Sequence, residues 1–187
     1  MSTQHLRENV TDKDLLHRAR LGDQKAFTTL VQRYESRVAA TVKGMLGNTD
    51  ESEDIGQEVF IRFYHALHAF REEASLGTYL TRIAINLSLD ELKRRKRKFL
   101  FFIPLSQEIS KAAMTEKEIS GSNDLKENLQ NALQKLAPEF RAVLVLRLID
   151  GYSTEETAKL LNLPVGTVLS RLARAQQKLR GILKPLI

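Results

Sequence analysis

The sequence predicts an all-α protein with two helical domains joined by a flexible linker, and three observations carry this prediction. Apolar residues recur at intervals of three and four along most of the 187 residues, while no stretch alternates with the two-residue period of a strand. Glycines and prolines fall mostly between the periodic stretches. Residues 104–124 are polar, weakly periodic and rich in turn formers at their end. We therefore expect domains at residues 10–98 and 126–187, with a linker at 99–125.

Helix signals follow one another through the first domain. Thr11 is a predicted N-cap, with Asp14 three residues later completing a capping box. The stretch GDQKAFTTLVQRY at residues 22–34 carries apolar residues at helical spacing. The strongest amphipathic pattern covers residues 50–70. The segment REEASLG breaks it, and a further helix is predicted to restart at Thr78 and run into a basic block.

The second domain contains the stretch GYSTEETAKLLNLPVGTVLSRLARAQQKLR at residues 151–180, which has the pattern of a helix-turn-helix. Ser153 and Glu156 form a capping box that starts a short helix. Asn162 tolerates the left-handed backbone of a tight turn, and Pro164 prevents the first helix from continuing. In such a motif the second helix enters the major groove of DNA. The alternative is an ordinary helical hairpin with a solvated cationic face.

The formal net charge of +6 is unevenly distributed. Residues 1–92 hold more acidic than basic side chains, whereas residues 93–98 are six consecutive cations and residues 141–187 hold eight Lys or Arg against three Asp or Glu. Two separate basic regions favour a polyanionic partner such as nucleic acid. The acidic first lobe favours a second partner that is basic.

Composition also argues against several classes of protein. The chain has no cysteine, which excludes disulfides and thiolate metal sites. It has no apolar stretch long enough for a membrane span and no signal-peptide core near its first residues, so we expect a soluble, cytoplasmic protein without membrane insertion. The run KRRKRKFLFF at residues 93–102 allows a solvated helix end, a nucleic-acid contact or a membrane-surface anchor. No amphipathic insertion helix accompanies it, which disfavours the membrane anchor.

An enzyme is the alternative from another functional class. His65 and His68 share a helix face and could bind a metal, but no third ligand stands at a suitable spacing. The sequence contains neither a nucleophile elbow nor a phosphate-binding loop. We therefore predict no catalytic activity, no metal site and no cofactor. A stand-alone helix-turn-helix regulator is the nearer alternative, although such a protein needs a sensor or dimerisation domain that the first ninety residues do not suggest.

Three segments, in order, resemble the extracytoplasmic-function (ECF) sigma factors of bacterial RNA polymerase. ESEDIGQEVFIRFYHAL and FREEASLGTYLTRIAINLSLDELKRRKRK are similar to the second domain of that family, as is GDQKAFTTLVQRY to its start. LAPEFRAVLVLRLIDGYSTEETAKLLNLPVGTVLSRLARAQQKLR is similar to the fourth domain. The resemblance implies a factor that binds RNA polymerase core, at its clamp and flap regions, and directs it to promoter DNA. It also implies an anti-sigma factor as a further partner.

The resemblance assigns roles to particular side chains. It implies that an acidic helix face docks on the polymerase clamp, that the loop and helix after it bind the −10 element, and that the helix-turn-helix reads the −35 duplex. The polymerase-binding residues would be Glu53, Asp54, Gln57 and Glu58. The −10 residues would be Arg71, Glu72, Ser75, Asn86, Lys93, Arg94, Arg95 and Arg97. The −35 residues would be Thr167, Ser170, Arg171, Arg174 and Lys178.

The chain departs from the family pattern at a few positions. Tyr79 stands where Trp is usual, and core packing is the favoured role for it. Gly56 lies inside the clamp-docking helix and costs roughly 1 kcal/mol of local stability. Leu169 replaces a common Lys or Arg in the reading helix, which leaves its effect on the −35 preference open.

Overall fold

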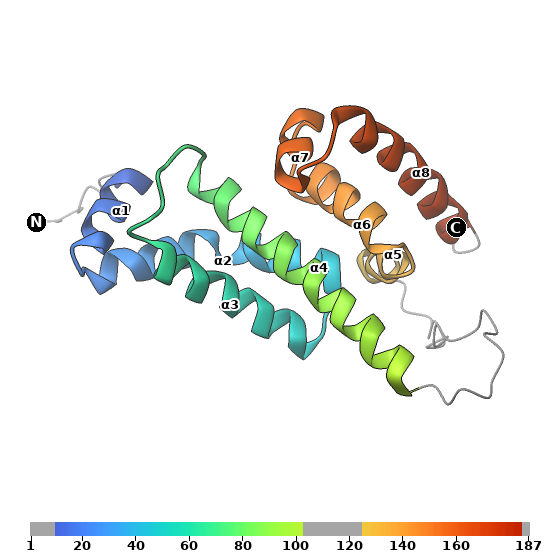
Figure 1. Ribbon diagram of the computed structural model, residues 1–187, viewed down its shortest axis with the longest axis horizontal. Coiled ribbons are helices and arrows are strands. Elements are labelled where there is room, and N and C mark those ends of the chain that lie inside the picture. Colours follow the sequence, from blue (N-terminus) through green and yellow to red (C-terminus); the bar gives the residue numbers. More distant parts are fainter. Residues whose placement is uncertain (1–9, 103–124, 185–187) are drawn as a thin grey trace, which may run out of the picture.

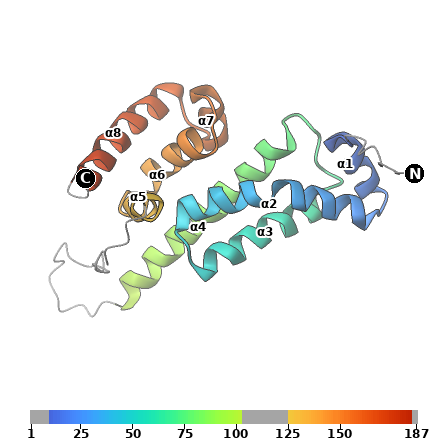
Figure 2. The ribbon, with the colours of Figure 1, turned by 180° about the vertical axis from the view of Figure 1, so that it is seen from behind.

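The computed structural model describes residues 10–102 and 125–184. The first part folds into the helices α1 (Asp12–Arg20), α2 (Gln24–Leu46), α3 (Asp50–Ala66) and α4 (Leu76–Phe102). The long helices α2, α3 and α4 pack against one another, and α1 lies across the start of α2 (Figures 1 and 2). The second part contains α5 (Leu125–Gln134), α6 (Pro138–Leu144), the π-helical turn η1 (Val145–Ile149), α7 (Thr154–Leu161) and α8 (Val165–Leu183). The all-helical prediction is confirmed.

Local capping starts these helices where the sequence places polar side chains. The Thr11 hydroxyl accepts a hydrogen bond from the Asp14 N–H, and the Asp14 carboxylate accepts one from the Thr11 N–H at 3.2 Å. Asp23 accepts from two amides in the first turn of α2. The Ser75 hydroxyl accepts from the Thr78 N–H at 3.2 Å, which is why α4 begins at Leu76 rather than at Thr78. Each cap satisfies an amide that has no partner inside its helix.

The predicted helix at residues 50–70 is shorter than expected at its end. α3 ends at Ala66, because the amides of Ala69 and Phe70 turn back to the Ala66 carbonyl. Phe70 nevertheless stays in the core, where its ring lies 4.7 Å from that of Tyr79 and 6.2 Å from that of Phe63. The apolar periodicity thus continued past the helix because the following turn also faces the core.

The second part has the predicted helix-turn-helix. The Ser153–Glu156 capping box starts α7, and Asn162 has φ 52° and ψ 51°, in the left-handed region. The Leu163 N–H bonds to the Ala158 carbonyl at 2.9 Å and closes the end of α7. Val168 of α8 is fully buried against this turn. Val168, Ala175 and Leu179 form the buried row of α8.

The two parts pack directly against each other, which the sequence did not predict. One apolar cluster joins the core of α1–α4 to residues of the second part, which are Ala142, Val145, Leu146, Tyr152 and Leu160. The contact is close at Gly44 of α2, where an added Cβ would meet Val145 at 2.9 Å. In Figures 1 and 2, α5 and α6 lie beside the last turn of α2 and the middle of α4. Residues 103–124, which hold most of the predicted linker, lie outside the described residues.

Side chains of the second part cap the end of α2. The Gln130 amide donates to the Lys43 carbonyl, and the Gln134 amide donates to the Gly44 carbonyl at 3.2 Å. Arg141 is 4% exposed and donates to the Met45 carbonyl, to the Gln134 carbonyl at 2.6 Å and to the Leu136 carbonyl at 2.9 Å. The last carbonyls of a helix have no partner within it, so these bonds replace water at a buried helix end. Burial, together with the charge of Arg95, lowers the pKa of Arg141 to about 10.

Candidate nucleic-acid interface

The acidic face predicted to bind a protein lies on the outer surface of α3. Glu53, Asp54 and Gln57 are exposed, and Glu58 pairs with Arg62 at 2.8 Å. The first turn of α3 also carries Asp50 and Glu51, whose negative charges are stabilised by the positive end of the helix dipole. Two large apolar side chains continue the exposed face toward the end of the helix; they are Ile61 and Tyr64. The face therefore combines negative charge with an apolar patch.

A long-range contact holds the loop between α3 and α4. Arg20, at the end of α1, donates to the Leu67 carbonyl at 3.1 Å and to the Phe70 carbonyl at 2.5 Å. Its guanidinium also pairs with Glu72 at 2.8 Å. Glu72 has φ 58°, a left-handed conformation that non-glycine residues rarely adopt. Arg20 thus fixes the loop backbone in a shape that local sequence alone would not favour.

The loop displays some of its predicted DNA-binding side chains and uses others structurally. Arg71 is exposed. Ser75 caps α4, and Glu72 is paired with Arg20, so both side chains already have structural partners. Asn86 is exposed one turn after the exposed Arg82 on α4, which places a cation and an amide on the same helix face. Arg82 was not among the predicted residues, although its i, i+4 spacing to Asn86 could have identified it.

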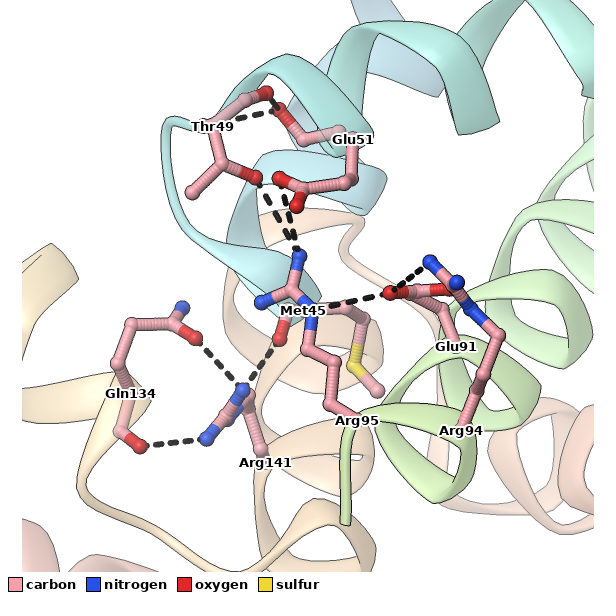
Figure 3. Close-up of polar contacts among 9 residues, drawn as sticks. Met45, Thr49, Glu51, Glu91, Arg94, Arg95, Gln134 and Arg141 are labelled. Atoms are coloured by element: carbon pink, nitrogen blue, oxygen red, sulfur yellow. Dashed lines mark hydrogen bonds and ion pairs between the residues drawn. The ribbon is translucent and has the colours of Figure 1, made fainter. Parts of the chain in front are cut away.

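The basic end of α4 is partly neutralised by acids of the same chain (Figure 3). Glu91 is 7% exposed and accepts from Arg94 at 2.6 Å and from Arg95 at 3.1 Å. Arg95 also donates to Thr49 at 3.4 Å and lies 3.6 Å from Glu51, which connects α4 to the start of α3. The hydrogen bond from Arg94 lowers the pKa of Glu91, so this cluster stays ionised at neutral pH.

The remaining cations of the run are exposed. Lys93 pairs with Asp90 at 3.1 Å on the surface, where such a pair is worth little and is readily exchanged for another anion. Lys96, Arg97 and Lys98 are exposed as well. The run therefore divides into two arginines with partners in the fold and four cations accessible to a polyanion.

The predicted −35 residues lie along one side of α8 and differ in their surroundings. Ser170 and Arg174 are exposed, whereas Thr167 and Arg171 are half-buried. Lys178 lies over the Phe140 ring at 5.7 Å from its centroid, a cation–π contact. Arg171 faces a cleft of about 370 Å³ between α4 and the second part of the chain. The cleft is lined by Leu89, Leu92, Lys93, Lys96, Pro138, Glu139, Ala142, Leu161, Leu163 and Arg171.

Comparison with known proteins assigns both halves of the chain to one family. Residues 30–98 match Sigma-70 region 2, and residues 126–179 match Sigma-70, region 4. The chain is 35% identical over 193 residues to the ECF RNA polymerase sigma-E factor of Escherichia coli (strain K12), covering 96% of this chain and 98% of the relative. It belongs to the ECF family of RNA polymerase sigma factors. It is also 33% identical to the ECF RNA polymerase sigma factor SigW of Bacillus subtilis (strain 168), over 93% of this chain and 97% of SigW.

Solved structures of sigma factors share the fold. CnrH, solved in complex with the cytosolic domain of CnrY, is 27% identical with a TM-score of 0.66, covering 93% of this chain and 97% of CnrH. The sigma factor RpoE, solved with the anti-sigma factor NepR from Bartonella quintana, is 24% identical with a TM-score of 0.67, covering 86% of this chain and 98% of RpoE, which supports the fold.

The sigma-factor assignment agrees with the predicted function. As a sigma factor, the chain binds RNA polymerase core and directs promoter-specific transcription initiation without catalysing a reaction itself. In the described ranges 10–102 and 125–184, no helix is long and apolar enough to cross a membrane.

The fold brings Lys93 of α4 and Arg171 of α8 to one cleft, although they are far apart in sequence. Arg20 and Arg141 were missed, because each binds a carbonyl far away in the sequence, that of Phe70 for Arg20 and that of Met45 for Arg141.

Proposed function

We propose that the two helical parts of this sigma factor have separate tasks, with residues 10–98 binding the polymerase clamp and the −10 element and residues 126–187 reading the −35 duplex. Residues 99–125 would connect them along the polymerase surface. The observation that carries this proposal is the exposed cationic side of α8 behind a capped helix-turn-helix, on a chain whose α3 exposes acids instead. Opposite charges on the two surfaces suit a basic protein partner and a polyanion respectively.

On α3, we propose that Glu53, Asp54, Gln57 and Glu58 bind the clamp. The first three are exposed and need no rearrangement, and the surface pair between Glu58 and Arg62 is weak enough to open. The neighbouring Ile61 would add apolar burial to this contact. Polymerase would therefore dock on a surface that is charged at the start of the helix and apolar toward its end.

At the −10 element, we propose that Arg71 and the exposed face of α4 bind DNA. Asn86 can hydrogen-bond a base, while Lys93 and Arg97 can neutralise phosphates. Glu72 and Ser75 would contribute through the loop shape that they help to set. Arg94 and Arg95 would reach DNA after exchanging Glu91 for a phosphate, which costs the interaction with a buried carboxylate.

At the −35 element, we propose that Thr167, Ser170, Arg171, Arg174 and Lys178 contact duplex DNA. Substitution of Arg174 tests this contact most directly, because Arg174 is exposed at the centre of this side of α8. Each good bidentate contact between Arg and guanine discriminates by about 1–3 kcal/mol. We also expect the bound state to separate the two parts of the chain, since elements about 25 base pairs apart are separated by about 85 Å at about 3.4 Å per pair.

An anti-sigma factor is proposed as a regulatory partner. The cleft between α4 and the second part is lined mostly by apolar residues, with three cations, Lys93, Lys96 and Arg171, against one acid, Glu139. Such a surface suits an amphipathic, acidic protein segment. CnrH, whose fold this chain shares, was solved with the cytosolic domain of CnrY. A role at RNA polymerase would place the chain in the cytoplasm.

Reconstituted transcription tests the proposed function. Purified protein is added to RNA polymerase core with a pool of genomic promoters, and run-off transcripts are sequenced. We expect core-dependent, promoter-specific transcripts and only weak binding of the free protein to duplex DNA. Specific duplex binding by free protein without any stimulated transcription would instead support a stand-alone helix-turn-helix regulator.

Matched variants separate the two surfaces. Arg174→Ala should lower transcription from promoters that depend on their −35 sequence by about tenfold, while core binding is retained. Arg180→Ala removes another exposed arginine of α8 near its end and serves as the control. Asp54→Lys should weaken core binding, whereas Glu155→Lys reverses an exposed charge on α7 and should not. Loss of core binding in Arg174→Ala would contradict the division of tasks.

A further inference from the structure

Residues 165–174 of α8 present an exposed face that shares Ser170 and Arg174 with the cationic side described above. Thr167, Val168, Arg171 and Leu172 are buried or half-buried in this segment. Every other position is exposed, and these positions form two adjacent i, i+4 rows. The rows are Val165, Leu169 and Ala173, and Gly166, Ser170 and Arg174. A helix that enters the major groove contacts base edges with this N-terminal part.

Leu169 dominates this face. It is 53% exposed, and Gly166, Ser170 and Ala173 beside it are small. A Cβ added at Gly166 would meet no atom within 4 Å, so the helix can approach a surface closely there. The Ser170 hydroxyl donates to the Thr167 carbonyl at 3.0 Å and is therefore occupied as a donor. Close approach would press one large apolar side chain against the partner.

The charge of α8 favours DNA over an apolar protein surface as that partner. Residues 165–183 contain four Lys or Arg and no Asp or Glu. A helix with this balance is repelled by basic proteins and attracted to phosphates. An apolar side chain in the major groove has one favourable contact among the four bases, which is the C5-methyl group of thymine. Against the polar edges of the other bases it would remove water without replacing its hydrogen bonds.

We propose that Leu169 packs on the C5-methyl group of a thymine and makes this sigma factor selective for thymine at one base pair of the −35 element. This inference rests on the proposed function, in which α8 reads that element. Val165, 41% exposed and one turn earlier, extends the apolar row toward the neighbouring base pair. A Lys or Arg at position 169 would instead favour guanine or a phosphate, so the departure from the family pattern changes the base that is read.

Replacing thymine by deoxyuridine tests this inference, because it removes the methyl group and keeps every hydrogen-bonding atom. Holoenzyme is reconstituted from the full chain and RNA polymerase core, and a promoter is taken from the transcribed pool. Each −35 thymine is replaced in turn, and competitor-resistant promoter complexes are measured. We expect one position at which the replacement lowers promoter binding about fourfold, the value for exposing one methyl group.

The same templates are then tested with variants. Leu169→Ala should bind thymine and deoxyuridine templates equally, whereas Leu169→Met should retain the preference for thymine. Leu129→Ala removes an equally apolar, exposed leucine from α5 and should leave the about fourfold ratio unchanged. Because Leu169 is exposed, the substitutions should not unfold the domain, and the ratio between templates cancels any change in the active fraction.

The possible failures are distinguishable. Without promoter-specific complexes from the wild-type holoenzyme, the proposed function is wrong and the inference on Leu169 is withdrawn with it. If complexes form but no thymine is sensitive, or if Leu169→Ala is as sensitive as wild type, the inference is wrong and the proposed function stands.

Discussion

Substituting Gly44 by alanine tests whether the two parts of the chain pack together in solution. Gly44 lies inside α2, where glycine costs about 1 kcal/mol relative to alanine. The alanine Cβ would lie 2.9 Å from Cγ2 and 3.3 Å from Cγ1 of Val145, and 3.0 Å from Cδ1 of Ile149. Ile149 is exposed and can move aside, but Val145 is fully buried and β-branched, so its methyl groups cannot rotate away freely.

The gain in helix propensity and the steric overlap with Val145 change the stability in opposite directions, and the overlap has the larger effect. Overpacking a filled core costs about 1–3 kcal/mol, against a gain of about 1 kcal/mol from helix propensity. We therefore expect Gly44→Ala to lower the free energy of unfolding by about 1 kcal/mol. Gly56→Ala is the matched control, because Gly56 lies inside α3 and an added Cβ meets no atom within 4 Å. That variant should raise the free energy of unfolding by about 1 kcal/mol.

Urea denaturation followed by circular dichroism measures both variants. With a slope of about 2 kcal/mol/M, each change moves the midpoint by about 0.5 M, in opposite directions. If Gly44→Ala stabilises the protein as much as Gly56→Ala does, then α2 and η1 do not pack together in solution. That result would refute the interface between the two parts while leaving each helix intact.

Three further predictions concern the same interface. Burial raises the pKa of Asp150 to about 6, although Thr41 donates to its carboxylate at 2.9 Å. The folded pKa lies above the ordinary value of 3.8 for an aspartate, so this group contributes stability below about pH 4 that is lost as the pH rises through 6. Asp150→Asn should therefore raise the free energy of unfolding by about 1–2 kcal/mol at pH 7.5 and by less at pH 5. Urea titrations at both pH values measure this difference. An equal effect at both pH values would contradict the buried charge. Arg141→Met should lower the free energy of unfolding by about 3 kcal/mol, because it leaves buried carbonyls without donors. A loss below about 0.5 kcal/mol would show that water reaches the end of α2. Cysteines introduced at the exposed positions Glu35 and Gln177 can carry a pair of fluorescent labels. Energy transfer between the labels should be present in the free protein and lost in the promoter complex. Unchanged transfer would contradict separation of the two parts.

Residues near one another in the sequence account for what could be predicted. The Ser153–Glu156 box, left-handed Asn162 and Pro164 act within one or two turns, and the helix-turn-helix they predict is present. The Glu91 pairs with Arg94 and Arg95 also follow the i, i+3 and i, i+4 spacing, and the sequence could have revealed them. The family motifs likewise predict a sigma factor, which the matches to known proteins confirm.

The helices, the helix-turn-helix and the family can be predicted from the sequence alone, because they depend on periodicity, caps and motif order. The contact of Arg20 with the loop before α4, the capping of α2 by Arg141 and the cleft shared by α4 and α8 appear only in the folded chain. A buried donor binds whichever carbonyl the packing leaves without a partner. That choice depends on how helices distant in the sequence come together, which no local pattern encodes.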